Sequence, residues 1–301
     1  MLPRRDIEPR ALLTQLAPDL ADASLRELGE GFDNVAYLVG DDMVLRISKH
    51  SDLSERQHVA ARDGEILTLA NRFSTLPTSE VLAIDVAQGA LLLTHVAGRA
   101  LSHVLRTDEP HWDGARLASL DRGSFTAQMA GFLTSLWSAS PDELRGHVPM
   151  PPVSAAQWLA QTTIAYQQMR CPLAVEDRRR IESFLGSPVL GDDTWEVFSH
   201  NDLGEDHIFV DADGTASGVI DWSDAVIGDP ARDLALLMLD LGPTIAMDVV
   251  DQLGAHRFGD LTSRARWWAA RSGVEGVAWR AANRPDTVEA ALTKLRAVFD
   301  V

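Results

Sequence analysis

The segment SHNDLGEDHIFVD, residues 199–211, concentrates carboxylate, imidazole and amide side chains between two strand-like stretches. Asp202 lies in its polar part, and Asp221 follows nineteen residues later at the end of the stretch SGVID. A loop that leaves a strand holds side chains outside the sheet, and the later stretch would bring Asp221 to the same edge. Phosphoryl transfer requires a carboxylate for the proton of the acceptor hydroxyl, metal ligands for the nucleotide phosphates, and a cation on those phosphates. The two aspartates therefore indicate metal-dependent phosphoryl transfer.

Three strand-like stretches surround this polar segment. WEVFS precedes it, HIFVD forms its end, and SGVID follows the turn DADGT, all within residues 195–221. Short apolar stretches that are bounded by Asp and Gly are typical of strands. We expect a hairpin there, with the polar segment as a functional loop at its entrance.

The first hundred residues have the pattern of a sheet crossed by one helix. Between residues 24 and 49, apolar stretches alternate with the turn sequences GFDN and GDD, which predicts three short antiparallel strands. Residues 53–73 have a helical pattern. Two further strand candidates follow at 80–86 and 90–96. The sequence therefore predicts a five-stranded antiparallel sheet with one helix.

Beyond Gly98 the pattern becomes mainly helical. Helices are expected at about residues 116–138, 155–169 and 175–186, and again from Pro230 onward. The predicted fold class is α+β. We expect two lobes, which comprise residues 1–96 and 97–301.

Composition excludes several classes of protein. Lys and Arg number 27 against 44 Asp and Glu, and the resulting net charge of −17 repels nucleic acid and anionic lipid. The longest apolar runs, ALLL and LALLML, are far shorter than the roughly 18 residues of a membrane span. One cysteine, Cys171, permits no internal disulfide, and residues 1–10 do not resemble a secretory signal. We expect a cytoplasmic protein without a nucleic-acid or membrane partner, whose charge would attract a cationic ligand.

Two blocks of sequence carry a family resemblance. HNDLGEDHIFV, followed by VIDWSDAVIGDPARDLA, resembles the signature of the aminoglycoside phosphotransferase superfamily, which has the bilobal protein kinase-like fold. GEGFDNVAYLVGDDMVLRISKHS is similar to the opening hairpins of the aminoglycoside 2''-phosphotransferases. Between about residues 100 and 190, only helical character matches. The resemblance implies a nucleotide-binding N-terminal lobe and a C-terminal lobe with the catalytic loop and the acceptor site.

By this resemblance, Asp202 is the catalytic base that orients the acceptor hydroxyl, and Asp221 is the ligand that bridges magnesium to the β- and γ-phosphates. His207 stands where most members have a metal-binding asparagine, as in the 2''-phosphotransferases and the macrolide phosphotransferases. Because magnesium prefers oxygen ligands, a water-bridged contact from His207 is an alternative to direct coordination. The resemblance also makes His200 a scaffold for the loop and Asp233 its support from below.

Arg46 occupies, by the same resemblance, the position of the family's phosphate-binding lysine, which pairs with an acid on the following helix. Arginine keeps the charge and can grip phosphate oxygens bidentately. Its partner would be Asp63 or, in another helix register, Glu65, and Lys49 is a reserve cation. Nucleotide binding is therefore predicted at Arg46 and Asp63.

Further nucleotide contacts are predicted at a turn and at a connecting segment. Gly31, in the turn GEGFDN, would let backbone N–H groups cover the triphosphate. Thr94, His95 and Val96 would face the base between the lobes. The implied phosphate donor is ATP or GTP, and Mg²⁺ is the implied cofactor.

For the acceptor, Ser223, Asp224 and Asp240 are candidates, because acids near the reaction centre would suit cationic amines. The leading interpretation is a kinase that transfers the γ-phosphate of ATP or GTP to a hydroxyl of an aminoglycoside-like antibiotic. The first alternative is a macrolide phosphotransferase, since VIDWSDA and the histidine at 207 are equally similar to those enzymes. A metabolic hydroxyl compound, such as an amino alcohol or a sugar, is the next alternative acceptor.

Three C-terminal tryptophans, Trp267, Trp268 and Trp279, would wall the apolar pocket of a macrolide kinase. Large aromatics at helical spacing more often belong to the core, so we predict core positions for them. A rival of another class is a pseudokinase that binds nucleotide without turnover. Arg46 and His207 favour it, and the intact pair of aspartates opposes it.

Overall fold

The computed structural model describes residues 8–106, 115–189, 195–254 and 258–300. Five antiparallel strands form a sheet in the order β1-β2-β3-β5-β4, as predicted. Their bounds are β1 Leu25–Glu30, β2 Asn34–Val39, β3 Met43–Ser48, β4 Val81–Asp85 and β5 Ala90–Thr94. The two helices that pack on this sheet are α1 Pro9–Leu16 and α2 Leu53–Phe73.

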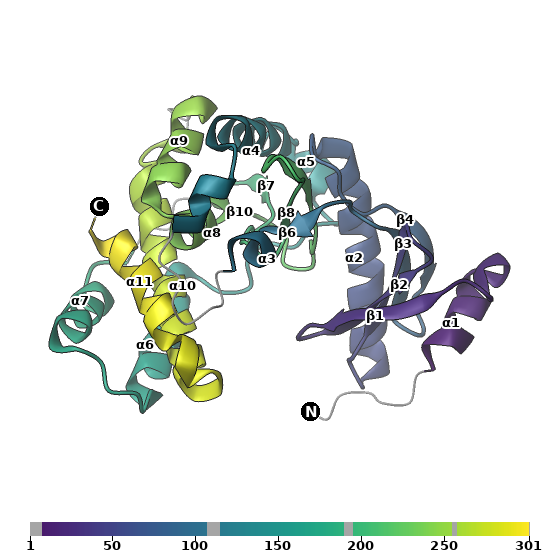
Figure 1. The fold of residues 1–301 in the computed structure, drawn as a ribbon, viewed down its shortest axis with the longest axis horizontal. Coiled ribbons are helices and arrows are strands. Elements are labelled where there is room, and N and C mark those ends of the chain that lie inside the picture. The colour runs from purple at the N-terminus through teal and green to yellow at the C-terminus, as the bar shows by residue number, and fades with distance from the viewer. Residues whose placement is uncertain (1–7, 107–114, 190–194, 255–257, 301) are drawn as a thin grey trace.

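The two faces of this sheet bury different helices. Successive side chains of a strand point to opposite faces, so Leu45 and Ile47 of β3 face the cluster that contains Leu12 and Leu13 of α1. Arg46, between them, points to the other face, which α2 covers. Figure 1 shows α2 lying between the sheet and the helical part of the molecule. The period of the strand therefore turns Arg46 toward the rest of the chain.

Helix α2 begins where Asp52 caps it, because the side chain of Asp52 accepts a hydrogen bond of 2.8 Å from Glu55 N. Asp63 is buried on the same face as Ile66, Leu67 and Ala70. That spacing is one face of a helix, and it presses a carboxylate against the sheet. The predicted helix at 53–73 is confirmed.

The polar segment at residues 199–211 lies among two small sheets. One contains β6 Arg99–Ala100, β8 Ile208–Val210 and β9 Ala216–Val219, and the other pairs β7 Val197–Ser199 with β10 Val226–Gly228. The predicted hairpin is present as β8 and β9. The stretch WEVFS is not part of it, because β7 pairs with β10 instead. Strands β6 and β10 have two and three residues, too few for the sequence pattern to reveal.

Helices make up most of the remaining described residues. They are α3 Leu101–Leu105, α4 Arg122–Leu136, α5 Pro141–Leu144, α6 Ala155–Gln168, α7 Val175–Leu185, α8 Ala231–Leu241, α9 Pro243–Leu253, α10 Leu261–Asn283 and α11 Val288–Phe299. The first predicted helix, 116–138, is shorter than expected, because Asp121 caps α4 through Ser124 N at 3.2 Å. The α+β class with a mainly helical C-terminal part is confirmed. Among the described ranges, none of the helices combines the length and the apolar composition that a membrane span requires.

One hydrophobic cluster runs from α2 and β5 into the helical part. The division after residue 96 therefore crosses a shared core, and it stays a prediction. Trp267 and Trp268 belong to this cluster and are 8% and 7% exposed. Trp279 does not: it is 51% exposed, so its predicted core position is wrong. Trp279 lies near the end of α10 and is not among the residues that this helix buries.

Candidate active site

The imidazole of His207 lies between the carboxylates of Asp202 and Asp221. Its Nδ1 donates to the backbone oxygen of Asp202 at 2.8 Å and lies 3.3 Å from Asp202 Oδ2. Its Nε2 lies 3.6 Å from Asp221 Oδ2. The two aspartates that the sequence singled out are therefore brought together around one ring.

The backbone at this centre adopts an unusual conformation twice. Asn201 has φ of 69° and Asp221 has φ of 61°, so both lie in the left-handed region. Asn and Asp tolerate this region better than other L-residues, but it still costs free energy. The left-handed conformation of Asn201 turns the chain directly before Asp202, and that of Asp221 turns the chain at Asp221 itself. Each turn thus presents a carboxylate after the end of a strand.

The charges of the three groups are interdependent. Burial alone would lower the pKa of His207, but the carboxylates of Asp202 and Asp221 outweigh it and raise that pKa. Partial burial raises the pKa of Asp202, and the neighbouring carboxylates add to this effect. Partial burial also acts to raise the pKa of Asp221. The positive charges of His207 and then Arg46 outweigh this effect, so the pKa of Asp221 is lowered. The cluster therefore favours the anionic form of Asp221 and the protonated form of His207.

His200 links the two halves of the centre from beneath. It is fully buried, its Nε2 donates to Ile220 O at 3.0 Å, and its Nδ1 accepts from Asp202 N at 3.3 Å. Burial and the charge of His207 lower the pKa of His200 to about 4, so the ring is neutral at neutral pH. The neutral ring needs one donor and one acceptor, which these contacts supply. They give His200 the scaffold role that the sequence predicted.

Asp233 supports the loop from below, as predicted. Its carboxylate is fully buried and accepts hydrogen bonds from Asn201 N at 2.8 Å, Ser199 Oγ at 2.9 Å and Trp137 Nε1 at 2.8 Å. Burial raises the pKa of Asp233 to about 6 although these three donors oppose the shift. Residue 201 is thus tied to α8 directly before the proposed base.

We expect Asp233→Ala to lower the free energy of unfolding by about 3 kcal/mol, because three buried donors lose their acceptor. Urea denaturation measures this loss. The matched control is Asp248→Ala, which removes a partly exposed ion pair with Arg122 and is expected to cost less than about 1 kcal/mol. Equal losses in the two variants would contradict the supporting role of Asp233.

Arg46 meets Asp63 in the ion pair that the sequence predicted, with Nη2 2.6 Å from Oδ2. The alternative partner, Glu65, instead contacts His147 at 3.2 Å. Ser223 joins the pair, since its hydroxyl donates to Asp63 Oδ2 at 2.8 Å. The hydroxyl contacts of Ser223 thus lie on the Arg46 side of the centre, and its predicted acceptor role stays a prediction.

Sequence reasoning missed two features of this centre. Arg62 lies 3.0 Å from Asp63 Oδ1 and donates to the backbone oxygen of Ser223, also at 3.0 Å. Trp222, the residue after Asp221, is buried, and its Nε1 donates to Thr78 Oγ1 at 2.7 Å. The contacts of Arg62 with Ser223 and of Trp222 with Thr78 join residues more than a hundred positions apart, so no local pattern signals them. They anchor the chain immediately after Asp221.

The turn that contains Gly31 is held by Lys49. The ammonium of Lys49 donates to Gly31 O at 2.9 Å and lies 2.6 Å from Glu30 Oε1. Gly31 does not have positive φ, and a Cβ there would meet only Asn34 O at 3.7 Å. The backbone conformation therefore does not require glycine, and a role of the turn over the triphosphate stays a prediction.

The segment from Thr94 to Val96 connects the sheet to the helical part. His95 N donates to Asp42 O at 2.8 Å, so this N–H is already used within the protein. Gly218 of β9 packs here, since a Cβ on it would lie 2.2 Å from Val96 Cγ1 and 2.8 Å from Pro77 O. Glycine thus lets the catalytic hairpin approach this segment closely. Binding of the base at Thr94, His95 and Val96 stays a prediction.

Asp224 and Asp240 have different surroundings. The surface of Asp224 is exposed. The surrounding protein still raises its pKa, first by partial desolvation of the carboxylate and then through the charge of Asp221. Asp240 Oδ1 lies 3.2 Å from the ammonium of Lys294, which is also 2.7 Å from Glu205 Oε1. The charge of Asp240 is therefore balanced by a buried lysine. Acceptor binding by either aspartate stays a prediction.

We expect Lys294→Met to lower the free energy of unfolding by about 3 to 5 kcal/mol, because it leaves two carboxylates without their buried cation. Lys294 is only 6% exposed, and the carboxylates raise its pKa although burial opposes them. Thermal or urea unfolding measures this loss. The control is Arg72→Met, which breaks an exposed ion pair with Glu143. A loss as small as that of the exposed pair would show that the buried cluster is not needed for stability.

The donor set fits magnesium through Asp221 better than through His207. Within the described ranges, no three His, Cys, Asp or Glu side chains are grouped to hold a metal ion. Magnesium in kinases usually needs only one or two carboxylates, because nucleotide phosphates complete its shell. The carboxylate of Asp221 is 48% exposed and can serve in this way. His207 Nδ1 is a donor and its raised pKa favours the imidazolium, which lacks a lone pair for a metal.

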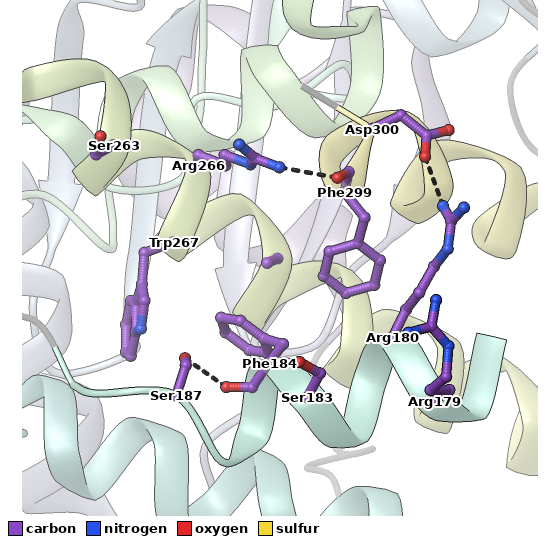
Figure 2. A pocket seen from close by; sticks show the side chains of 11 residues that line it. Arg179, Arg180, Ser183, Phe184, Ser187, Ser263, Arg266, Trp267, Phe299 and Asp300 are labelled. Carbon is purple, nitrogen blue, oxygen red and sulfur yellow. Dashed lines mark hydrogen bonds and ion pairs between the residues drawn. The ribbon is translucent and has the colours of Figure 1, made fainter. Parts of the chain in front are cut away.

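A cavity of about 630 Å³ lies away from this centre, between α7, α10 and α11. Figure 2 shows that its arginines are largely occupied: Arg266 donates to the backbone oxygen of Phe299, and Arg180 pairs with Asp300. None of the predicted site residues lines it. A smaller cavity of about 200 Å³ lies directly beside Asp202. The smaller cavity is lined by Asp202, whereas Asp221 does not line either cavity.

Comparisons with known proteins agree with this geometry. The family model described as APH, phosphotransferase enzyme family, matches residues 24–268. Viomycin phosphotransferase from Streptomyces vinaceus is 28% identical over 129 residues, which cover 42% of this chain and 45% of that protein. The alignments span less than half the length of the curated relatives that the chain matches.

Solved structures match nearly the whole chain. The GDP and kanamycin complex of APH(2")-IIia has a TM-score of 0.72 at 20% identity, and the match covers 96% of this chain and 97% of that chain. The macrolide 2'-phosphotransferase MphH from Brachybacterium faecium has a TM-score of 0.60 at 20% identity, with 95% and 97% covered. At these identities the likeness shows the fold, and it confirms the predicted architecture.

Proposed function

The chain belongs to the phosphotransferase enzyme family, and we propose that it transfers the γ-phosphate of ATP or GTP to an alcohol group of a small molecule. The observation that carries this proposal is the placement of His207 between Asp202 and Asp221, with distances of 3.3 Å and 3.6 Å to their carboxylates. One carboxylate is thus available to the acceptor and the other to the donor. In this proposal residues 1–96 bind the nucleotide and residues 97–301 bind the acceptor.

Asp202 acts as the general base in this proposal. The acceptor oxygen forms a bond to the γ-phosphorus, the bond between that phosphorus and the bridging oxygen breaks, and the nucleoside diphosphate leaves with the bond's electron pair. The hydroxyl proton moves to the carboxylate of Asp202. That carboxylate is 39% exposed and borders the 200 Å³ cavity, so an acceptor can reach it. His207 holds the loop through the backbone oxygen of Asp202.

Arg46 and Asp221 serve the nucleotide phosphates in this proposal. Asp63 orients the guanidinium of Arg46, which supplies positive charge beside Ser223. When bound at Asp221, Mg²⁺ would supply charge neutralisation on the β- and γ-phosphates. The exposure of the Asp221 carboxylate and its lowered pKa support its role as the anionic ligand.

The finer proposal for the acceptor is an aminoglycoside-like antibiotic, with a macrolide as the alternative. It rests on the sequence resemblance and on similar proteins whose names include kanamycin and macrolide 2'-phosphotransferase. Asp224 is exposed next to the centre and would suit an ammonium group. A pseudokinase is less well supported, because both aspartates have the surroundings that the reaction needs.

A coupled assay of diphosphate release with ATP and with GTP tests this function. Each nucleotide is offered with kanamycin, with a macrolide, and with small hydroxyl compounds, in the presence of Mg²⁺ and of EDTA. We expect acceptor-stimulated, magnesium-dependent release. Nucleotide binding without stimulation by any acceptor would favour the pseudokinase instead.

A further inference from the structure

The cavity beside Asp202 is basic on its far side. Arg232 and Leu236 of α8, and Trp268 and Arg271 of α10, line it together with the proposed base. No residue of the five-stranded sheet or of α2 contributes to this lining. The cavity therefore lies on the acceptor side of Asp202 and not on the side of Arg46.

The two arginines are packed against the same two indole rings. The guanidinium of Arg232 lies 4.7 Å from the ring centre of Trp268 and 5.9 Å from that of Trp158. The guanidinium of Arg271 lies 4.8 Å from Trp158 and 5.9 Å from Trp268. The indole faces attract both cations and hold their planes in place, but they bring two like charges together.

The carboxylates around Arg232 are occupied by other groups. Asp229 accepts from Arg264 at 3.1 Å, and Asp233 accepts from Ser199 Oγ, Asn201 N and Trp137 Nε1. Across the described ranges, the guanidinium of Arg232 forms no ion pair or hydrogen bond with a side chain. Burial, and then the charge of Arg271, lower the pKa of Arg232 to about 10. Arg232 is thus a largely buried cation that forms no ion pair among the described residues, although the charges of Asp233, Asp229 and Asp224 favour it. A ligand that paired with it directly would offset the cost of burying it.

Two further polar atoms at the cavity lack partners. Arg271 is 8% exposed, and its Nη1 and Nη2 contact Glu275 and Ser272. Its Nε is buried and makes no hydrogen bond, and the same holds for Asn201 Oδ1, beside Asp202. An oxyanion could accept from the arginine, and an acceptor hydroxyl or amide could donate to the asparagine.

We propose that the acceptor substrate carries a carboxylate or phosphate group, which binds at Arg232 and Arg271 while the hydroxyl to be phosphorylated reaches Asp202. This inference rests on the proposed phosphoryl transfer to an alcohol and names an anionic acceptor in place of a cationic aminoglycoside. The fork of a guanidinium matches the two oxygens of such a group and orients the rest of the molecule. The oxyanion also supplies an anionic partner for Arg232, whereas Arg271 is paired with Glu275 through Nη1 and would offer its unpaired Nε. A polycation such as an unmodified aminoglycoside would meet two like charges at this place.

The inference is tested by measuring kcat/KM of the wild-type protein with matched acceptors. Hydroxy acids of two to six carbons are compared with their amides and with the phosphate monoesters of the corresponding diols, and kanamycin and a macrolide are included. We expect kcat/KM for a carboxylate or phosphate member to exceed that of its neutral partner by about 100-fold, the size of a lost charged hydrogen-bond pair. The preferred member shows whether the acceptor's anionic group is a carboxylate or a phosphate.

Arg232→Gln and Arg271→Gln should each remove this preference, mainly through KM, and leave nucleotide affinity unchanged. Arg232→Lys keeps the charge without the fork and should retain part of the preference. The control is Arg179→Gln, which removes a 71% exposed arginine far from the cavity and should change nothing. If loss of the stacking prevents either variant from folding, the comparison in wild-type protein still decides.

Equal or better turnover of the amides, of kanamycin or of the macrolide would overturn the inference while the proposed function stands. Absence of turnover with every member, in protein that binds nucleotide and magnesium, also counts against the inference. Failure to bind ATP or GTP at all would instead overturn the proposed function. The two failures are therefore distinguishable.

Discussion

Asp202→Asn is expected to bind nucleotide with unchanged affinity and to lose phosphoryl transfer. General-base catalysis contributes about 10²- to 10⁴-fold, so kcat should fall by that factor. Asparagine preserves the shape of the side chain and the backbone oxygen that His207 Nδ1 contacts at 2.8 Å, but it cannot take the acceptor proton. The loss should therefore appear in kcat while the Kd for ATP or GTP, measured by titration calorimetry, does not change.

A surface carboxylate provides the control for this variant. Asp142 is 86% exposed, so Asp142→Asn removes the same charge without touching the centre. It should keep full activity. If Asp202→Asn retained more than about a tenth of wild-type kcat, the base would be another group, since even weak general-base catalysis is worth more than that.

Asp221→Ala is expected to abolish both turnover and the effect of magnesium on nucleotide binding. The variant removes the carboxylate whose pKa His207 and Arg46 hold low against partial burial. Loss of one preorganised electrostatic contact to a transferred group commonly costs 10²- to 10³-fold in kcat, and we expect at least about 100-fold here. Titration of ATP with Mg²⁺ and with EDTA measures the second effect.

In wild-type protein, Mg²⁺ should tighten nucleotide binding, and in Asp221→Ala it should not. Asp248→Ala, which alters a surface ion pair with Arg122, is the control and should respond to magnesium as wild-type does. A variant in which magnesium still tightened binding would place the metal on other ligands. A loss of transfer alone in Asp202→Asn, together with a loss of the magnesium effect in Asp221→Ala, would support different roles for the two aspartates.

The N-terminal part of the fold was predictable from the sequence for a physical reason. Strand and helix periods of the first hundred residues are regular, and the polar turns that separate them are short. The predicted bounds of the helix, 53–73, therefore agree with α2. Asp63 was recognisable as the partner of Arg46 because its place on the helix follows from the same period that buries Ile66 and Leu67.

The residues proposed here for the acceptor side were not predictable in this way. Arg271 and Trp268 lie three residues apart on α10, but Arg232 lies at the start of α8, and only the packing of the two helices brings it onto Trp268. The sequence around Arg232 does not signal this contact. Ser223 and Asp240 were expected at the acceptor, but their side-chain contacts are with Asp63 and with Lys294. Their acceptor roles stay predictions, because these contacts do not test acceptor binding.

Direct detection of the phosphorylated product tests the central claim. Phosphorus NMR would follow wild-type protein and Asp202→Asn with ATP or GTP, Mg²⁺ and the best acceptor of the panel. We predict that wild-type protein forms a phosphate monoester of the acceptor and nucleoside diphosphate in equal amounts, and that Asp202→Asn forms neither above background. Release of inorganic phosphate without the monoester, or equal monoester formation by the two proteins, would contradict the assignment of Asp202 as the base of a small-molecule kinase.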